Sequence, residues 1–458
     1  MNVKLISECF IKPSNFQQER TKQVLHRTPW DLCLLTGHYI QKGLLFRKIS
    51  VLDDEASSIQ GFLQRLKHSL SVTLAHFYPL AGRLATQTCD DPHSYVVYID
   101  CSHSPGAKFV HSKVDLTVSD ILSPTYVPSV VQHFFDHYKA VNHDGHSLSL
   151  LTVQVTELID GIFIGFSSNH CVADGTSFWQ FINTLSEVFR ENIGNEAIQI
   201  SSPPVHGCWF PDGYGPFYSL PFTHHDQFIN RYQVPELKER IFHFSVAALA
   251  RIKAKANALC KDRGITVSTL QALSALMWRC VIRGRGLEQN HTSICRTSVN
   301  IRSRLEPPLP HNYFGNGIQT VAAVTTAGEL LEHDLGWAAA QLTEAIAKHD
   351  DKAVREALLK WLQNPIIHQI EHLVKPGLVM FGSSPRFNMY GNEFGLGKAV
   401  AVLSGHDNKF DGKGTLYPGK EGGGSIDVDL CLIPHSMSAL ERDEEFLDAL
   451  NFHSDQTM

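Results

Sequence analysis

Residues 201–235 interrupt the hydrophobic pattern of the chain, and this interruption limits the fold more than any other feature. The stretch is rich in proline, glycine, histidine and aromatic residues and lacks periodicity, which is typical of a crossover between domains. On both sides of it, short runs with β-strand alternation mix with longer runs of helical spacing. Because 458 residues are long for one hydrophobic core, we predict two similar α/β domains, at 1–200 and 236–458, each a mixed sheet with helices.

The composition excludes several classes of protein. Hydrophobic residues make up 43% of the chain, so it can bury a large core and is not a disordered protein. A net charge of −6 argues against nucleic acid as a partner, since phosphate binding needs a basic surface. The 10 cysteines form no C-x-x-C pair, which indicates reduced thiols in the cytoplasm. The first residues lack the apolar segment of a secretory signal, and no run approaches the roughly 20 apolar residues of a membrane span, so no membrane partner is expected.

Hydrophobic spacing predicts the elements of both halves. Strands are expected at 3–11, 95–99, 109–114, 148–158, 161–166, 240–245 and 293–302. Helices are expected at 56–74, 177–192, 246–260, 268–283, 329–350, 351–363 and 444–450.

Two of these strands form the clearest pair. The dipeptide Asp160-Gly161 stands between two β-rich runs and is a strong hairpin signal. The second strand leads directly to the motif His170-Cys171-Val172-Ala173-Asp174-Gly175, which a helix follows. A strand end holds a side chain firmly, and Gly175 lets the backbone turn away from it.

The histidine of this motif is a candidate base. An imidazole with a pKa of about 6.5 suits the removal of a proton from a hydroxyl or an amine. The alternative is a core histidine that hydrogen bonds satisfy at a strand end. Because the chain holds 25 histidines, the spacing H-x-x-x-D alone does not separate the two interpretations.

Four further segments resemble blocks of the plant BAHD acyltransferase family, in the order of that family. They are 3–14 (ending CFIKPS), 66–84 (LKHSLSVTLAHFYPLAGRL), 300–316 (NIRSRLEPPLPHNYFGN) and 392–398 (NEFGLGK), the last resembling the family's D-F-G-W-G. With the histidine motif they extend over nearly the whole chain. The resemblance implies two chloramphenicol-acetyltransferase-like domains around a central channel. It also implies an acyl-CoA-dependent O- or N-acyltransferase, acting on a small-molecule acceptor of specialised metabolism.

The resemblance also implies roles for single residues. His170 matches the general base of the family, and Asp174 matches an aspartate that forms a structural ion pair and is not a second base. In the second signature, Glu393 stands where the family has aspartate and is expected to pair with Arg302; a solvated Glu393 is the alternative. The other structural positions of the two signatures are Gly175, Phe394, Gly395 and Gly397.

The resemblance identifies the binding residues less directly than the motif residues. The family binds acyl-CoA as a co-substrate, holds no permanent cofactor and is usually monomeric. Lys253 and Lys255 are candidates for contacts with the coenzyme A phosphates, and a solvated helix face is the alternative. Arg386 matches a position where some relatives hold an acidic acceptor. Leu396 replaces the family's tryptophan, which is expected to alter the channel wall.

Other constellations are set aside. His133 and His137 are expected on one helix face, near His143 and His146, but no carboxylate or cysteine spacing completes a metal site, so no metal is expected. The run 224–226 (HHD) is expected at the surface. An enzyme of another class on the same fold, a lyase or cyclase that uses the motif histidine without coenzyme A, remains the alternative function. A non-catalytic binding protein is the third possibility. Coenzyme A binding distinguishes the acyltransferase from the other two possibilities.

Overall fold

The computed structural model describes residues 2–14, 24–48, 58–102, 105–191 and 200–450. The strands before residue 236 are β1 (Lys4–Ile11), β2 (Val24–His26), β3 (Ile40–Arg47), β4 (Arg83–Asp90), β5 (His93–Asp100), β6 (Ala107–Lys113), β7 (Leu151–Glu157), β8 (Gly161–Ser168) and β9 (Val205–His206). Those after it are β10 (Lys238–Phe244), β11 (Thr292–Asn300), β12 (Tyr313–Phe314), β13 (Ile318–Thr326), β14 (Leu378–Gly382), β15 (Ala401–Ser404), β16 (Lys413–Pro418) and β17 (Ile426–Leu432).

The α-helices in these ranges alternate with the strands. They are α1 (Pro29–Leu32), α2 (Ile59–His76), α3 (Val118–Leu122), α4 (Gly175–Glu191), α5 (Val246–Leu259), α6 (Thr269–Arg285), α7 (Ala327–Glu332), α8 (Leu335–Ala347), α9 (Asp351–Gln363), α10 (Pro434–Leu440) and α11 (Glu444–Leu450). Most predicted elements are present within a few residues. The predicted helix start at 56 and helix end at 192 lie outside the described residues. None of the helices in the described ranges combines the length and the apolar character that a bilayer span needs.

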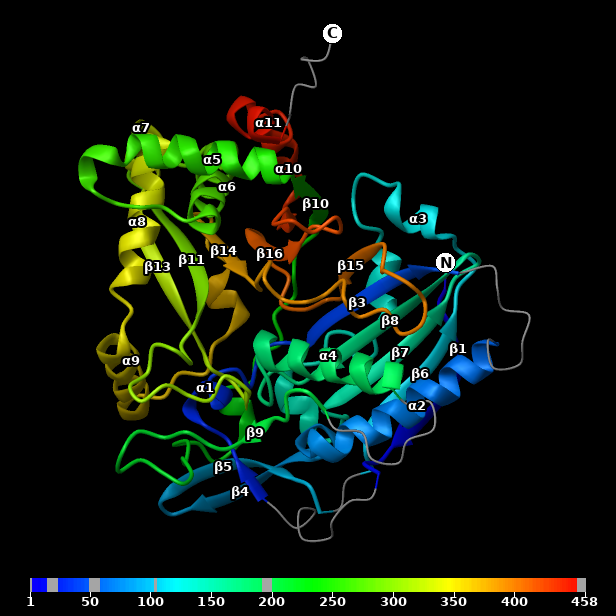
Figure 1. Cartoon of the computed structure of the whole chain (residues 1–458). Helices are drawn as coiled ribbons and strands as arrows, with labels where there is room; N and C mark the ends of the chain where they lie inside the picture. Colours follow the sequence, from blue (N-terminus) through cyan, green and yellow to red (C-terminus); the bar gives the residue numbers. More distant parts are fainter. Residues whose placement is uncertain (1, 15–23, 49–57, 103–104, 192–199, 451–458) are drawn as a thin grey trace.

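Two six-stranded mixed sheets organise the molecule (Figure 1). The first has the order β1-β6-β7-β8-β3-β15, and the second has the order β10-β17-β16-β14-β11-β13. Each contains both parallel and antiparallel pairs. The predicted architecture of two mixed α/β domains is therefore confirmed. The strand β15 follows residue 236 but pairs with β3, so the second half of the chain completes the first sheet.

The predicted hairpin forms the centre of the first sheet. β7 and β8 pair from Leu151 with Ser168 to Glu157 with Ile162. A side chain at Gly161 would lie 2.7 Å from the Phe46 carbonyl oxygen, so only glycine allows β3 to approach this turn. All eight residues of β8 are buried, because β7 and β3 flank the strand and helices cover the sheet.

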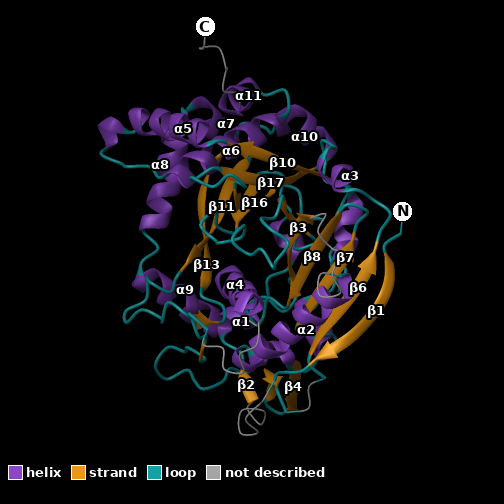
Figure 2. Ribbon diagram, turned by 45° about the vertical axis from the view of Figure 1, so that its right-hand side comes forward, coloured by secondary structure: helices purple, strands orange, loops and turns teal. Residues whose placement is uncertain are grey.

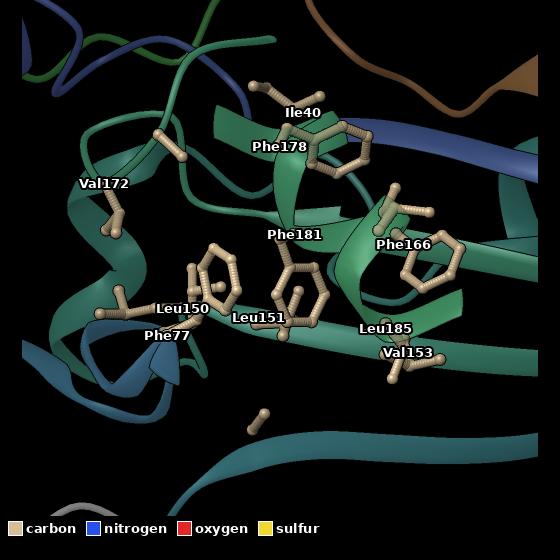
Figure 3. Close-up of a cluster of buried hydrophobic side chains, with 14 of the residues drawn as sticks. Ile40, Phe77, Leu150, Leu151, Val153, Phe166, Val172, Phe178, Phe181 and Leu185 are labelled. Atoms are coloured by element: carbon tan, nitrogen blue, oxygen red, sulfur yellow. The ribbon is translucent and has the colours of Figure 1, made fainter. Parts of the chain in front are cut away.

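Helices α2 and α4 cover this sheet with an aromatic core (Figure 3). Phe178 and Phe181 of α4 point toward Phe166 and Val153 of the strands, and the Phe77 ring meets Phe181 edge-on at 5.5 Å. Each fully buried phenylalanine side chain contributes about 1.5–3 kcal/mol. The apolar stripe of α4 therefore holds the helix, and the loop before it, against the sheet.

The second sheet buries one face beneath α5, α6 and α8 (Figure 2). α6 begins with a capping box between Ser268 and Gln271 and ends at Gly286, whose φ of 58° closes the helix in the left-handed conformation. Phe381, Leu416 and other apolar residues of the strands fill this face. The opposite face of the sheet is more polar.

Two predictions about helices are wrong. The helix expected at 329–350 is divided into α7 and α8, because the Asp334 side chain accepts a hydrogen bond from the Trp337 N–H and starts a new helix. His133 and His137 do not share a helix face. His133 lies in a 3-10 turn that ends at Phe134, and His137 has a φ of 61°.

Candidate active site

The motif that follows β8 lies between the first sheet and α4. The Asp174 side chain accepts a hydrogen bond from the Ser177 N–H at 3.0 Å, and the Asp174 carbonyl accepts one from the Phe178 N–H at 2.8 Å. Asp174 therefore caps the first turn of α4. Since β8 and α4 are both buried, the short loop that carries His170 is held at both ends.

Three asparagines hold the backbone of the motif. The His170 N–H donates to Asn142 Oδ1 at 2.7 Å, and the His170 carbonyl accepts from Asn316 Nδ2 at 2.7 Å. Asn169 donates from Nδ2 to the Asn142 carbonyl and accepts from the Cys171 N–H. Asn316 is the last residue of the 300–316 block, so residues from both halves of the chain position the histidine. No motif spacing predicted a role for these asparagines.

Asp174 is fully occupied by structural contacts. Arg302 donates to both of its carboxylate oxygens, at 2.7 and 3.1 Å, and the Gly317 N–H donates to Oδ2 at 2.9 Å. Burial raises the pKa of Asp174, but Arg302 and the N–H groups of Ser177 and Gly317 outweigh burial, so its pKa lies below the ordinary value. An ionised carboxylate with these contacts has no role as a second base.

The His170 ring is half-buried, and its Nδ1 atom is buried. Burial lowers the pKa of His170 below the ordinary 6.5, against the opposing fields of Asp174 and Asp407 and a contact with Asn316. The imidazole is therefore neutral at pH 7. Because Nδ1 faces inward, Nε2 is the nitrogen available to accept a proton from a bound molecule.

A buried polar network lies between the two sheets near this histidine. Lys42 of β3 pairs with Asp407 and donates to Ser404 Oγ at 3.0 Å. Ser404 Oγ also donates to Asp429 Oδ2 of β17 at 3.0 Å, and the Tyr417 hydroxyl contacts both groups. These bonds join β3 and β15 of the first sheet to β16 and β17 of the second. No motif pointed to them, because the residues come from four separate segments.

The second signature is structural in its contacts. Phe394 is fully buried, with a φ of 48°, and its ring meets Phe189 of α4 at 5.8 Å. Gly395 and Gly397 have φ values of 70° and 75°, which suit glycine. Asn392 donates to Asn183 Oδ1 of α4 at 2.9 Å. The segment therefore packs on the first domain although it belongs to the second half of the chain.

The expected Glu393–Arg302 pair is wrong. Glu393 is exposed and makes no ion pair with any described residue. Arg302 is buried and bound to Asp174, and its remaining N–H groups reach Ser177 Oγ and the Gly315 carbonyl. The aspartate of the first signature, 128 residues away in sequence, takes the place expected for Glu393.

The candidate binding residues lie in two places, and the loop of one of them packs on the histidine motif: a Cβ atom at Gly175 would lie 3.3 Å from the ring of Phe387, the neighbour of Arg386. Lys253 and Lys255 are exposed on α5, which packs through Leu249 and Ile252 on the apolar face of the second sheet. Arg386 is exposed in the loop after β14. The structure thus places these cations at the surface.

The histidine clusters have other contacts. His137 Nε2 bonds with Ser149 Oγ at 2.8 Å, and His143 Nε2 bonds with the Tyr95 hydroxyl at 2.8 Å. The side-chain ligand atoms of the 224–226 run lie within 4.8 Å of one another; His224 and Asp226 are exposed, as expected, and His225 is half-buried.

Comparisons with known proteins define the family. The Transferase family model matches residues 1–447. An uncharacterized acetyltransferase of Arabidopsis thaliana is 37% identical over 98% of this chain and 99% of its own, and the BAHD acyltransferase DCR of the same plant is 34% identical over 98% and 93%. Among solved structures, vinorine synthase superposes with a TM-score of 0.73 at 22% identity over 98% of this chain and 99% of its own. TRI101 of F. sporotrichioides, complexed with coenzyme A and T-2, superposes with a TM-score of 0.69 at 17% identity over 93% and 98%.

The family resemblance drawn from the sequence blocks is thereby confirmed, and the two-sheet fold agrees with that of the solved structures. The chain belongs to the Transferase family, the family of the BAHD acyltransferases.

Proposed function

We propose that the protein transfers an acyl group from acyl-CoA to a hydroxyl or amine of a small molecule, with His170 as the general base. The observation that carries this proposal is the state of the His170 ring. It is half-buried, its pKa is lowered below 6.5, and its backbone is held from both sides by Asn142 and Asn316. A neutral, firmly positioned imidazole suits proton removal at pH 7.

The reaction follows from this arrangement. His170 Nε2 accepts the proton of the acceptor while the acceptor oxygen or nitrogen attacks the thioester carbonyl carbon. The new C–O or C–N bond forms, and the tetrahedral intermediate collapses with cleavage of the C–S bond. The coenzyme A thiolate then recovers the proton from the imidazolium. Asp174 remains ionised throughout, since Arg302 and two N–H groups occupy it.

A covalent acyl-enzyme is not part of this proposal. Cys171 is adjacent to the base, but its side chain is fully buried in the core of the first domain. Burial raises the pKa of the Cys171 thiol well above its ordinary value, so little thiolate exists. Direct transfer to the acceptor requires no nucleophilic side chain.

The co-substrate and the compartment are also proposals. A structural neighbour was solved with coenzyme A and T-2, which supports coenzyme A and a small-molecule acceptor as ligands here. The exposed Lys253 and Lys255 would contact coenzyme A phosphates at the surface. All 10 cysteines are free, which supports a reducing compartment such as the cytosol. We propose that the protein acts as a monomer.

Thermal unfolding with ligands tests the proposal. The purified protein is heated with free coenzyme A and with acetyl, malonyl, benzoyl and hydroxycinnamoyl thioesters. A ligand at about 100 times its Kd adds roughly 2.7 kcal/mol to the free energy of unfolding and raises the Tm. One thioester should exceed free coenzyme A, and a His170→Ala variant should bind it without transferring the acyl group. A folded protein that no thioester stabilises would refute coenzyme A use and favour a lyase or cyclase.

A further inference from the structure

The polar face of the second sheet, opposite α5 and α6, faces the first domain and is reached by solvent. Along β14 and β16 the residues alternate between the two faces. Phe381 and Leu416 are buried under the helices, whereas Met380, Lys413 and Thr415 on the other face are only partly buried. Central strands of a sheet are normally covered on both faces in such folds. Partial exposure here indicates space above the sheet.

Two cationic side chains stand on this face in one row. Arg296 of β11 is in register with Met380 of β14, which is in register with Lys413 of β16. Registered neighbours point to the same side of a sheet. The row therefore places Arg296 and Lys413 one strand apart, on either side of Met380.

Lys413 leans across β14 toward β11. A Cβ atom at Gly382 would lie 2.5 Å from Lys413 Nζ and 4.0 Å from Ser298 Oγ. The absence of a side chain at Gly382 thus makes room for the ammonium group and brings it beside β11. Ser298 lies two residues after Arg296 on the same face, so two cations and a hydroxyl converge there.

Neither cation forms an ion pair. Among the described residues, the side chains of Arg296 and Lys413 make no hydrogen bond and no ion pair, whereas Lys42 pairs with Asp407 and Lys409 pairs with Glu239. Asp407 and Asp429 lie within electrostatic range of Lys413 and oppose the effect of burial on its pKa. Burial lowers the pKa of Lys413 to about 8, and burial also lowers the pKa of Arg296, so both remain protonated at pH 7. Unpaired charges in a desolvated position are costly and are normally paired in the native state.

One carboxylate interacts electrostatically with both Lys413 and the candidate base. The Asp407 side chain is 11% exposed, and Lys42, Lys413 and His170 together lower its pKa. The field of Asp407 also acts on His170 and on Lys413. His170 and Lys413 therefore both lie within electrostatic range of the Asp407 carboxylate. His368 is the other titratable group beside Arg296, which contributes to its lowered pKa.

We propose that Arg296, Lys413 and Ser298 bind a carboxylate of the acceptor, so that the substrate class is a small hydroxy or amino acid. This inference rests on the proposed acyl transfer and names its acceptor class. An acceptor carboxylate would pair with the two cations and accept a hydrogen bond from the Ser298 hydroxyl. Its hydroxyl or amine would then be directed toward His170.

The same cations could meet an anion of a different source, the phosphates of coenzyme A. Their position argues for the acceptor. The row lies within the sheet and faces the buried network between the domains, whereas the candidates for phosphate contacts, Lys253 and Lys255, are exposed on α5, which covers the opposite face of the sheet. The experiment separates the two sources.

Paired acceptors test the site. Shikimate, tartrate, malate and glutamate are each compared with their methyl esters, first for binding by calorimetry without thioester and then for acyl transfer with the best thioester. The proteins are the wild type, Arg296→Gln, Lys413→Met and the control Lys348→Gln, whose lysine is 79% exposed. Circular dichroism confirms the fold of each variant.

The expected result is an acid that binds and reacts at least tenfold better than its ester. Loss of one charged contact should lower kcat/KM for that acid by about ten- to a hundredfold in Arg296→Gln and in Lys413→Met. The KM for the thioester should change less than about twofold in both variants, and Lys348→Gln should match the wild type.

Three results would overturn the inference. Equal use of acid and ester, or a preference that survives both substitutions, would exclude a carboxylate site. A raised KM for the thioester with unchanged use of the acid would assign the cations to coenzyme A. If no acyl transfer occurs, the proposed function fails separately, and calorimetry alone decides whether the acid binds through Arg296 and Lys413.

Discussion

Replacing Arg302 by methionine would leave the Asp174 carboxylate buried without its counter-ion. The guanidinium lies 2.7 and 3.1 Å from the two carboxylate oxygens, and Asp174 is 0% exposed. Removing one partner of a buried ion pair costs about 3–5 kcal/mol. The hydrogen bonds of Arg302 to Ser177 Oγ and the Gly315 carbonyl are lost as well, so we expect a loss near the upper end of this range.

The pH dependence of this loss identifies its cause. In the wild type the pKa of Asp174 is below its unfolded value, so its contribution to stability is present above that value and lost as pH falls through the folded pKa. Without Arg302, burial dominates and raises the pKa of Asp174. The destabilisation should then shrink as pH falls, because a protonated Asp174 no longer needs a counter-ion.

Urea denaturation followed by circular dichroism at pH 7.5 and pH 5.0 measures both effects. Arg304→Met is a matched control, since Arg304 donates to the Ile346 and His349 carbonyls and its loss leaves no carboxylate unpaired. The Asp174→Asn/Arg302→Met double variant should recover part of the loss. Equal, pH-independent costs for Arg302→Met and Arg304→Met would refute the reasoning, as would additivity in the double variant.

The remaining predictions concern the base, the unpaired lysine and the second signature. His170→Ala should lower kcat by about 10²–10⁴-fold with little change in Tm. In the wild type, kcat/KM should fall only below pH 6.5, because the pKa of His170 is lowered. Stopped assays of thiol release from pH 5 to 8 check both. Lys413→Met should raise the Tm at pH 7, because burial of the charged lysine destabilises the wild type. The pKa of Lys413 is lowered to about 8, so the wild type gains stability as pH rises from about 8, and the advantage of the variant should vanish above pH 10.5. Calorimetry with Lys348→Gln as control checks this. Phe394→Ala should cost about 3–5 kcal/mol, whereas Glu393→Gln should change stability by less than about 0.5 kcal/mol, as urea denaturation would show.

Elements that depend on local sequence were predictable. The β7–β8 hairpin follows from two β-rich runs and Asp160-Gly161, and α6 follows from its apolar stripe, its serine cap and its terminal glycine. The position of His170 between a strand and a helix is local in the same sense. The order of the family blocks predicted the fold, and superposition on a solved structure confirmed it.

One strand and one strand pairing that depend on distant partners were not predicted. β3 is buried along nearly its whole length although it includes Gln41 and Lys42, so its sequence shows neither alternation nor a continuous apolar run. β15 lies in the second half of the chain but completes the first sheet. The divided helix at Asp334 shows the converse case, where a local cap overrode a longer hydrophobic period.

The sequence by itself determined most helices and strands, the family and the residue that is the candidate base, because propensity, caps and motif spacing act over a few residues. Only the tertiary structure decided which of these distant charged residues come together. Arg302 binds Asp174 and not Glu393, and Arg296 and Lys413 come together only through strand register. Such contacts join residues more than a hundred positions apart, and which ones meet depends on how the two sheets pair and pack, which no local pattern encodes.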